Sequence, residues 1–160
     1  MMERLIRLDY VWLGGESTQT LRTKVRYQPF ELENPQQAPG MDELFSQIED
    51  WSFDGSSTNQ AKTEHSDLVL RPVKIYGNVF AQTSRGGNGP PSYVVFCEVF
   101  NPDGTAHESN ERAKLRELID ATGSSETEAI FGIEQEYVFW DVANNIPSGW
   151  EWDEKKKTAI

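Results

Sequence analysis

The amino-acid sequence predicts an α+β fold in which a β-sheet carries one main helix packed on a face. Three observations predict it. Residues 4–13 and 20–27 have the pattern of a strand pair, residues 93–100 are the most hydrophobic segment, and residues 111–121 form the one convincing helix. Further strand candidates lie between the strand pair and the helix and after the helix, so the elements do not alternate as in a doubly wound α/β protein.

The first two strands are predicted to form a hairpin. The "GGEST" stretch that separates them has turn chemistry. The second strand alternates strictly between two sets of side chains, which is the period of a half-buried strand. One face carries Leu21, Thr23, Val25 and Tyr27, and the other, expected to be wet and basic, carries Arg22, Lys24 and Arg26.

The next segments are a loop, a short helix and a turn. Residues 28–40 contain three prolines and a final glycine, which predicts a loop. In "MDELFSQIEDW" the apolar residues recur at helical spacing from Met41 to Trp51, which favours one short helix. The stretch "FDGSSTNQ", residues 53–60, is dense in turn-forming residues.

Two more strands and the main helix follow. Residues 67–75 indicate a strand whose Pro72 predicts an edge or a bulge, and residues 93–100 indicate a central strand. For the helix, Asn110 is the expected N-cap and Gly123 the C-terminal cap. Its apolar stripe consists of Leu115, Leu118 and Ile119. A strand over residues 129–140 and a charged tail, "EWDEKKKTAI", complete the chain.

Composition excludes several classes of function. The chain has 160 residues, enough for one domain, and a net charge of -11, which opposes binding to nucleic acid or to an anionic membrane. No apolar run approaches the roughly 20 residues of a membrane span, and charges interrupt the first residues, so we expect no secretory signal. The single cysteine, Cys97, indicates a reducing compartment, and the cytoplasm is the expected location.

Two carboxylates stand out in the apolar segment "FGIEQEY". On a strand, Glu134 and Glu136 project from the same face about 6.6 Å apart. Such a pair repels unless a cation or a basic group lies close, and carboxylate oxygens suit magnesium, manganese or calcium. The alternative is that this face is simply solvated. The spacing of the two glutamates does not decide between a metal site and a solvated face.

Asp54 is the third candidate. A loop carboxylate can act as a base or attract a cation, but Asp-Gly followed by serines is also ordinary turn chemistry. The cysteine and the two histidines of the chain are weaker candidates for a functional site. Cys97 fits a small buried hydrophobe, and neither His65 nor His107 stands at a metal-ligand spacing. The chain also lacks a phosphate-binding glycine loop flanked by a strand and a helix.

Several motifs in order resemble the N-terminal part of glutamine synthetase, specifically its type II, eukaryotic-like branch. They are "WSFDGSST", "HSDLVLRPVKI", "YVVFCEVFNPDG", "HESNER" and "FGIEQEY", and the resemblance covers roughly residues 5–150. It implies a β-grasp domain with a mixed sheet over residues 1–125. Residues 126–150 would then begin a truncated catalytic-domain-like segment, followed by the charged tail, residues 151–160.

The resemblance also implies roles for the three carboxylates. Asp54 would reach the active site of a neighbouring subunit, help to bind ammonium and remove its proton. Glu134 would bind the metal ion nearer the ATP phosphates, and Glu136 the ion nearer the substrate glutamate. The expected ions are magnesium or manganese, which neutralise phosphate charge during phosphoryl transfer.

The chain departs from the family pattern after "PSGW", and Ile130 stands where many relatives have tryptophan. Further ligands and the nucleotide pocket of the family have no counterpart in these residues. We therefore expect no ligase activity from the chain alone, weak metal binding, and ATP binding only where a catalytic domain is supplied. Expected partners are a second copy or a full-length glutamine synthetase subunit, which the chain would complete or modulate. The alternative is a non-catalytic β-grasp interaction or binding module.

Overall fold

The computed structural model of the chain describes residues 2–32, 40–79, 89–123, 130–153, 155 and 158–159. The chain divides into two units, Met1–Gly123 and Ser124–Ile160, and each is described by itself. The expected domain boundary after residue 125 falls on 124–129, outside the described residues. Within the described ranges, no helix has both the length and the apolar character required to cross a membrane.

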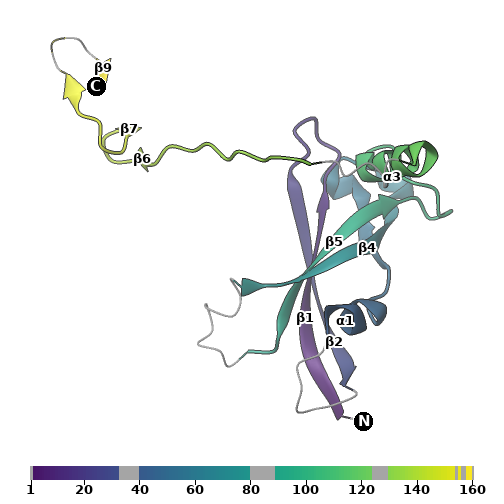
Figure 1. Cartoon of the computed structure of the whole chain (residues 1–160). Helices are drawn as coiled ribbons and strands as arrows, with labels where there is room; N and C mark the ends of the chain where they lie inside the picture. The colour runs from purple at the N-terminus through teal and green to yellow at the C-terminus, as the bar shows by residue number, and fades with distance from the viewer. Residues whose placement is uncertain are drawn as a thin grey trace. The chain divides into compact units, whose positions relative to one another are not determined.

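The first unit is built on a five-stranded sheet with two α-helices in its described part (Figure 1). The sheet has the strand order β2-β1-β5-β4-β3. The strands are β1 (Met2–Leu13), β2 (Leu21–Leu32), β3 (Trp51–Asp54), β4 (Asp67–Gly77) and β5 (Ser92–Phe100). The helices are α1 (Met41–Ser46) and α3 (Glu111–Thr122), and the turn after β3 contains the 3-10 helices η1 (Gly55–Thr58) and η2 (Thr63–His65).

The sheet is mixed. β1 pairs with β5 in parallel, whereas the β1–β2, β4–β5 and β3–β4 pairs are antiparallel. The predicted α+β class, the opening hairpin and the central position of residues 93–100 are therefore confirmed. The narrower β-grasp assignment stays a prediction.

β2 continues five residues beyond the predicted end of this strand. Residues 28–32, expected to begin a loop, are paired with β1, and Pro29 stands opposite Leu5. Proline is tolerated here because β2 is the edge strand of the sheet, where an N–H on the outer side needs no partner strand. The rest of the predicted loop, residues 33–39, lies outside the described residues.

The two faces of β2 are the reverse of the prediction. Lys24 and Arg26 are half-buried, and the same face continues into the fully buried Phe30. The ammonium group of Lys24 lies over an aromatic ring of the core side: its Nζ is 3.8 Å from the centre of the Trp51 ring. The opposite, exposed face of the sheet carries Leu13, Leu21, Val25, Tyr27, Tyr76 and Phe96.

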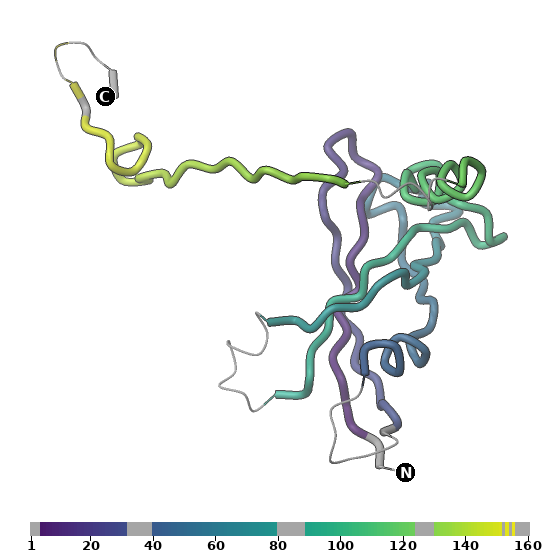
Figure 2. Tube along the Cα trace, in the orientation of Figure 1, coloured from purple at the N-terminus to yellow at the C-terminus, as the bar shows by residue number. Residues whose placement is uncertain are grey.

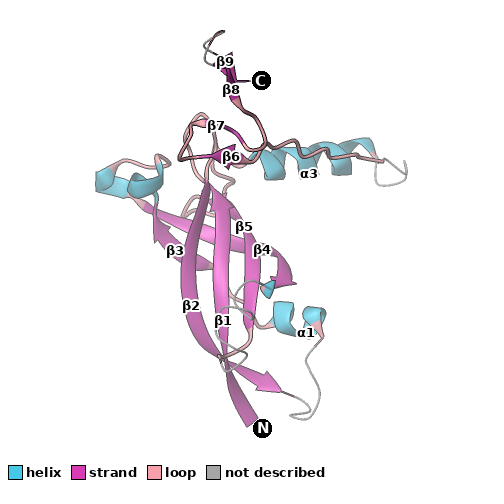
Figure 3. Ribbon diagram, turned by 90° about the vertical axis from the view of Figure 1, so that its left-hand side faces the viewer, coloured by secondary structure: helices cyan, strands magenta, loops and turns pink. Residues whose placement is uncertain are grey.

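The core lies on the concave side of the sheet. It consists of alternate residues of β1 together with side chains from α1 and from the four remaining strands of this sheet. These residues are Ile6, Leu8, Tyr10, Trp12, Phe30, Leu44, Phe53, Leu68, Leu70, Ile75, Val95 and Val99. The sheet curls enough to bring its two outermost strands together, because Lys24 Nζ of β2 donates a hydrogen bond to Ser52 O of β3 at 2.8 Å. Figure 3 shows the long β1–β2 hairpin and the shorter β3.

β4 has the predicted irregularity at Pro72. The register with β5 shifts between Pro72 and Lys74. Pairing with β3 ends at Leu70, so the proline sits where one side of β4 has no neighbouring strand among the described residues.

α1 and α3 lie near opposite ends of the sheet (Figure 3). α1 is shorter than its pattern suggested and buries Leu44. α3 has the predicted caps: Asn110 accepts a hydrogen bond from the Ala113 amide at 3.0 Å, and Gly123 is left-handed with φ 61°. Only Ala113 of α3 is buried, and the expected core stripe of Leu115, Leu118 and Ile119 is exposed.

The described part of the second unit contains two small strand pairs. β6 (Trp140–Asp141) pairs with β7 (Ile146–Pro147), and β8 (Trp152–Asp153) pairs with β9 (Thr158–Ala159). Residues 130–139, predicted as a strand, run as a drawn-out segment with no strand partner among the described residues (Figure 2). The backbone N–H and C=O groups of a strand need a second strand as their hydrogen-bond partner. This segment has the amino-acid composition of a strand, but no partner strand lies beside it among the described residues.

Candidate functional site

Asp54 occupies the junction between β3 and η1. It is the last residue of the strand and the N-cap of the 3-10 turn. Its Oδ1 accepts hydrogen bonds from the Ser56 amide at 2.9 Å and from the Ser56 hydroxyl at 2.6 Å. These bonds favour the charged form and hold the pKa of the exposed Asp54 carboxyl below its ordinary value. The structure therefore presents a stable anion to solvent.

The same turn chemistry occurs elsewhere in the chain. Asp103 Oδ1 accepts from the Thr105 amide at 2.9 Å and from the Thr105 hydroxyl at 2.6 Å, and the pKa of Asp103 is lowered for the same reason. Local hydrogen bonding does not by itself distinguish Asp54 as a site. The distinction must come from what surrounds each loop.

Gly55 fixes how closely the Asp54 loop approaches β4. A Cβ atom at Gly55 would lie 2.6 Å from Leu68 Cδ1 and 3.0 Å from Ala61 Cβ, which is too close for any other residue without displacement. The Gly55 amide donates to Ser66 O at 2.7 Å, and Gly55 O accepts from the Gln60 amide at 2.9 Å. The Asp-Gly pair thus combines an exposed carboxylate with a tightly seated backbone.

Gln60 is buried at the end of this loop, with 6% of its surface exposed. Its Nε2 donates to Leu13 O at 3.1 Å and to Ser109 Oγ at 2.8 Å. Its Oε1 accepts from Trp12 Nε1 at 3.3 Å and from the Thr58 hydroxyl at 2.8 Å. The side chain makes all four hydrogen bonds available to an amide.

His107 joins the β5–α3 connection to the Asp54 loop. It is buried, its Nε2 lies 2.7 Å from Gln60 O, and its Nδ1 lies 2.9 Å from Ser109 Oγ. Sequence reasoning set His107 aside because it has no metal-ligand spacing. The one sequence feature that could have drawn attention to His107 is its position in the "HESNER" motif. Its contacts with Gln60 and Ser109 become visible only in the fold.

Glu134 and Glu136 lie in the second unit, in the unpaired segment, and both are exposed. Asp54 belongs to the first unit, so the structure describes the loop aspartate and the glutamates separately. Nowhere in the described ranges do three or more histidine, cysteine or acidic residues form a group that could hold a metal ion. Magnesium takes about six ligands, so this carboxylate pair has suitable chemistry but does not form a complete site.

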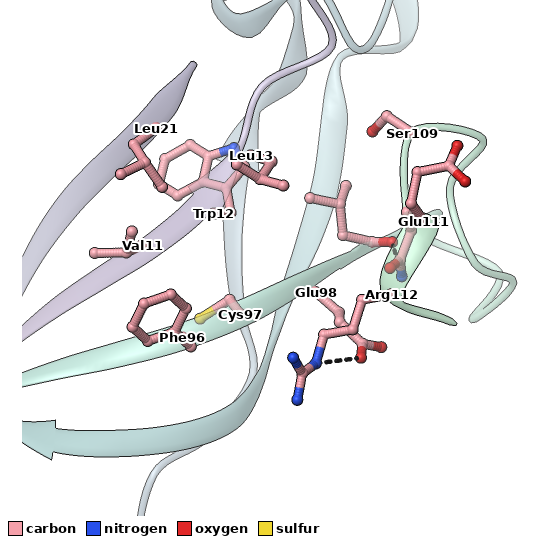
Figure 4. A pocket seen from close by; sticks show the side chains of 12 residues that line it. Val11, Trp12, Leu13, Leu21, Phe96, Cys97, Glu98, Ser109, Glu111 and Arg112 are labelled. Carbon is pink, nitrogen blue, oxygen red and sulfur yellow. Dashed lines mark hydrogen bonds and ion pairs between the residues drawn. The ribbon is translucent and has the colours of Figure 1, made fainter. Parts of the chain in front are cut away.

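One largely apolar pocket lies beside Ser109 and Asn110 rather than at Asp54 (Figure 4). It has a volume of about 240 Å³ and is lined by strand residues such as Val11, Phe96 and Cys97 and by the first residues of α3. Burial raises the pKa of the Cys97 thiol to about 12, so this thiol is not a nucleophile at neutral pH. In Figure 4, Arg112 reaches Glu98 at one edge of this pocket.

Comparison with known proteins shows extensive similarity to glutamine synthetases. The chain is 41% identical to glutamine synthetase of Streptomyces viridochromogenes over 84% of its own length and 34% of that protein. It is 37% identical to chloroplastic glutamine synthetase of Chlamydomonas reinhardtii over 89% of its length and 35% of that protein. Identity to the cytosolic isozyme 1-5 of Arabidopsis thaliana is 33%, over 89% of the chain and 35% of the isozyme.

The chain thus spans about a third of the length of the relatives it matches. No family model matches it. The relatives come from a bacterium, an alga and a plant, and they leave the expected type II branch a prediction.

Proposed function

We propose, from the premise that this chain is a glutamine synthetase-like segment, that it contributes the Asp54 loop to an assembly that ligates ammonia to glutamate at the expense of ATP. The observation that carries the proposal is the exposed, ionised Asp54 on a backbone that Gly55 and Gln60 hold in place. The chain alone would be inactive, and the remaining site residues would lie on further sequence of the same polypeptide or on another chain.

The chemistry of Asp54 suits an ammonium site. A carboxylate with a lowered pKa remains charged at neutral pH and attracts a cation. Asp67 stands opposite Asp54 in the β3–β4 register, so a second acidic residue adds to the negative potential there. A base works best when its pKa lies near the working pH, so the lowered pKa favours ammonium binding more than proton removal.

We assign Glu134 and Glu136 as carboxylate donors to a magnesium or manganese site that other residues complete. The support is the oxygen chemistry of the pair and the similarity of the surrounding segment to glutamine synthetases. A bound divalent ion would supply charge neutralisation for the phosphates. ATP would bind only where the nucleotide-binding residues are supplied.

The surfaces of the second unit support association with another protein. Phe131, Ile133, Tyr137 and Phe139 project from an unpaired segment and are each more than 70% exposed. An apolar segment whose backbone has no partner strand can add to the edge of another sheet. We propose a second copy of this chain or a full-length synthetase subunit as the partner. The cytoplasm is the proposed compartment, although relatives carry both cytosolic and chloroplastic names.

The same exposed segment favours a second candidate function, a non-catalytic interaction module that modulates a synthetase. That module would need the apolar segment and not the Asp54 carboxylate. Asp54→Asn separates the two, because it would abolish the catalytic contribution and leave association intact.

Glutamine formation from glutamate, ammonium, ATP and magnesium tests the proposal. The chain is assayed alone and after co-expression with the part of the Streptomyces relative outside the region of similarity. We expect no product from the chain alone and measurable product from the pair. Activity of the lone chain would contradict our account of an incomplete site. Co-purification without activity would favour the interaction module.

A further inference from the structure

The connection between β5 and α3 contacts the loop that follows Asp54 at the buried Gln60. His107 and Asn110 anchor this connection to the end of β5, since the His107 amide and the Asn110 side chain both donate to Val99 O, at 3.1 Å and 3.0 Å. The His107 side chain reaches the loop of residues 54–60, because its Nε2 lies 2.7 Å from Gln60 O at the end of that loop. A continuous path of hydrogen bonds therefore runs from the central strand to the loop.

The orientation of the Gln60 amide follows from its two fixed neighbours. The Trp12 indole N–H can only donate, so Oε1 must face Trp12. Leu13 O can only accept, so Nε2 must face Leu13. This orientation requires Thr58 to donate its hydroxyl proton to Oε1 and Ser109 Oγ to accept from Nε2.

The protons of Ser109 and His107 follow in turn. Gln60 O is an acceptor, so His107 Nε2 carries the proton and Nδ1 is the acceptor. The Ser109 hydroxyl donates to His107 Nδ1 at 2.9 Å, and the Ser109 amide points at the same nitrogen from 3.1 Å. Every hydrogen-bonding atom of the Gln60 side chain and of the His107 ring has a partner. A buried network that is fully satisfied specifies one conformation.

This network distinguishes Asp54 from Asp103. Both carboxylates make the same two bonds in their turns. The Asp54 turn is also tied to Gln60 through two bonds: the Gln60 amide donates to Gly55 O, and Thr58 donates to the Gln60 side chain. The Asp103 turn is exposed, and Gly104 has open space around its Cβ position.

We propose that Gln60, His107 and Ser109 are positioning residues for Asp54: they hold the η1 turn in the one conformation that presents the Asp54 carboxylate. The inference rests on the proposed function for its catalytic meaning, whereas its structural content rests on the hydrogen bonds of Gln60, His107 and Ser109 alone. None of the three residues acts on ammonium directly. They determine the backbone position from which Asp54 does.

Removing one hydroxyl from the network tests the proposal in the full chain. Ser109→Ala deletes the bridge between Gln60 and His107, and Gln60→Glu deletes the amide donors with almost no change of shape. Ser92→Ala is the matched control, because Ser92 is 3% exposed and its hydroxyl has no hydrogen-bond partner among the residues that the structure describes. Ser109→Thr keeps the hydroxyl and should restore the wild-type behaviour.

The readouts are the pKa of Asp54, from the NMR shift of its carboxyl carbon, and the amide exchange rate of Ser56 in the folded chain. With Ser109→Ala the Asp54 pKa should rise toward its ordinary value and Ser56 should exchange at least about tenfold faster. Ser92→Ala should change neither. If Ser109→Ala lowers global stability but leaves both readouts at wild-type values, the positioning role is wrong.

Both readouts are independent of catalysis. Should Asp54→Asn leave glutamine formation unchanged while Ser109→Ala moves the Asp54 pKa, the proposed function fails and the positioning network stands. Ser109→Ala carries the test if Gln60→Glu does not fold.

Discussion

Ser56 donates two hydrogen bonds to a single oxygen of Asp54, from its amide at 2.9 Å and from its hydroxyl at 2.6 Å. One serine therefore closes the start of the η1 turn with its amide and, with both groups, stabilises the charge that the turn presents. The lowered pKa of Asp54 is a direct consequence, since both bonds favour the carboxylate over the acid.

Ser56→Ala should raise the Asp54 pKa while leaving the turn in place, because the backbone bond remains. A carboxyl whose folded pKa is depressed stabilises the fold above its ordinary pKa of about 3.9, and this stability is lost as pH falls through the folded value. The variant should therefore show less loss of stability with acid than the wild type below about pH 4. NMR titration and urea unfolding at several pH values measure both effects. An unchanged Asp54 pKa would show that the hydroxyl bond is not the cause.

Gly55→Ala should destabilise the first unit by about 1–3 kcal/mol, the cost typical of overpacking. The reason is the 2.6 Å approach of a Cβ atom to Leu68 Cδ1. Gly77→Ala is the control, since the nearest atom to its Cβ position is the flexible Met41 Cε at 4.0 Å. Urea unfolding followed by far-UV circular dichroism would measure the difference. Equal stability of the two variants would contradict the close seating of the loop.

Arg116→Ala should cost more than an ordinary surface ion pair. The Glu98 side chain is 1% exposed, and Arg116 donates a hydrogen bond to its carboxylate. Arg112 Nε lies 3.3 Å from the other carboxylate oxygen, an ion pair without hydrogen-bond geometry. Losing Arg116 leaves a buried charge less well paired, and we expect about 1–3 kcal/mol because both arginines are half-exposed.

Two further variants check this explanation. Lys114→Ala removes an exposed pair with Glu111 on the same helix and should cost less than about 1 kcal/mol. Adding Glu98→Gln to Arg116→Ala removes the buried charge and should recover part of the loss. Strict additivity in this double-mutant cycle would show that the two side chains are not coupled.

Lys24→Ala should destabilise the first unit by about 1 kcal/mol, from the lost hydrogen bond to Ser52 O and the lost contact with the Trp51 ring. Lys74→Ala, at an exposed position of β4, should be close to neutral. The two variants are compared by thermal unfolding. Equal midpoints would mean that the contact between β2 and β3 contributes nothing to the closure of the sheet.

The sequence was most informative where local chemistry decides the structure. The hairpin, the bulge at Pro72 and both caps of α3 follow from turn residues, proline and capping side chains, which act within a few residues. The faces of β2 did not, because ending the strand before Pro29 hid the buried Phe30 that marks the core side. Long basic side chains on that face then resembled a solvated surface.

The candidate site shows the same division. The Asp-Gly turn was visible in the sequence, but its support comes from His107 and Ser109, about fifty residues along the chain. No spacing rule connects such distant residues. The strand over residues 129–140 has a clear pattern, yet a strand exists only with a partner, and the partner is not among the described residues.

The most direct test of the central claim is the ammonium dependence of glutamine formation by the co-expressed assembly, with Asp54→Asn compared against Asp103→Asn. The two aspartates make the same turn bonds, so the pair of variants separates the role of Asp54 from the loss of a turn. We predict that Asp54→Asn lowers kcat/KM for ammonium at least about a hundredfold, since it removes the charge that attracts ammonium, whereas Asp103→Asn stays near wild type. Equal kcat/KM values for the two variants would contradict the assignment of Asp54 to the reaction.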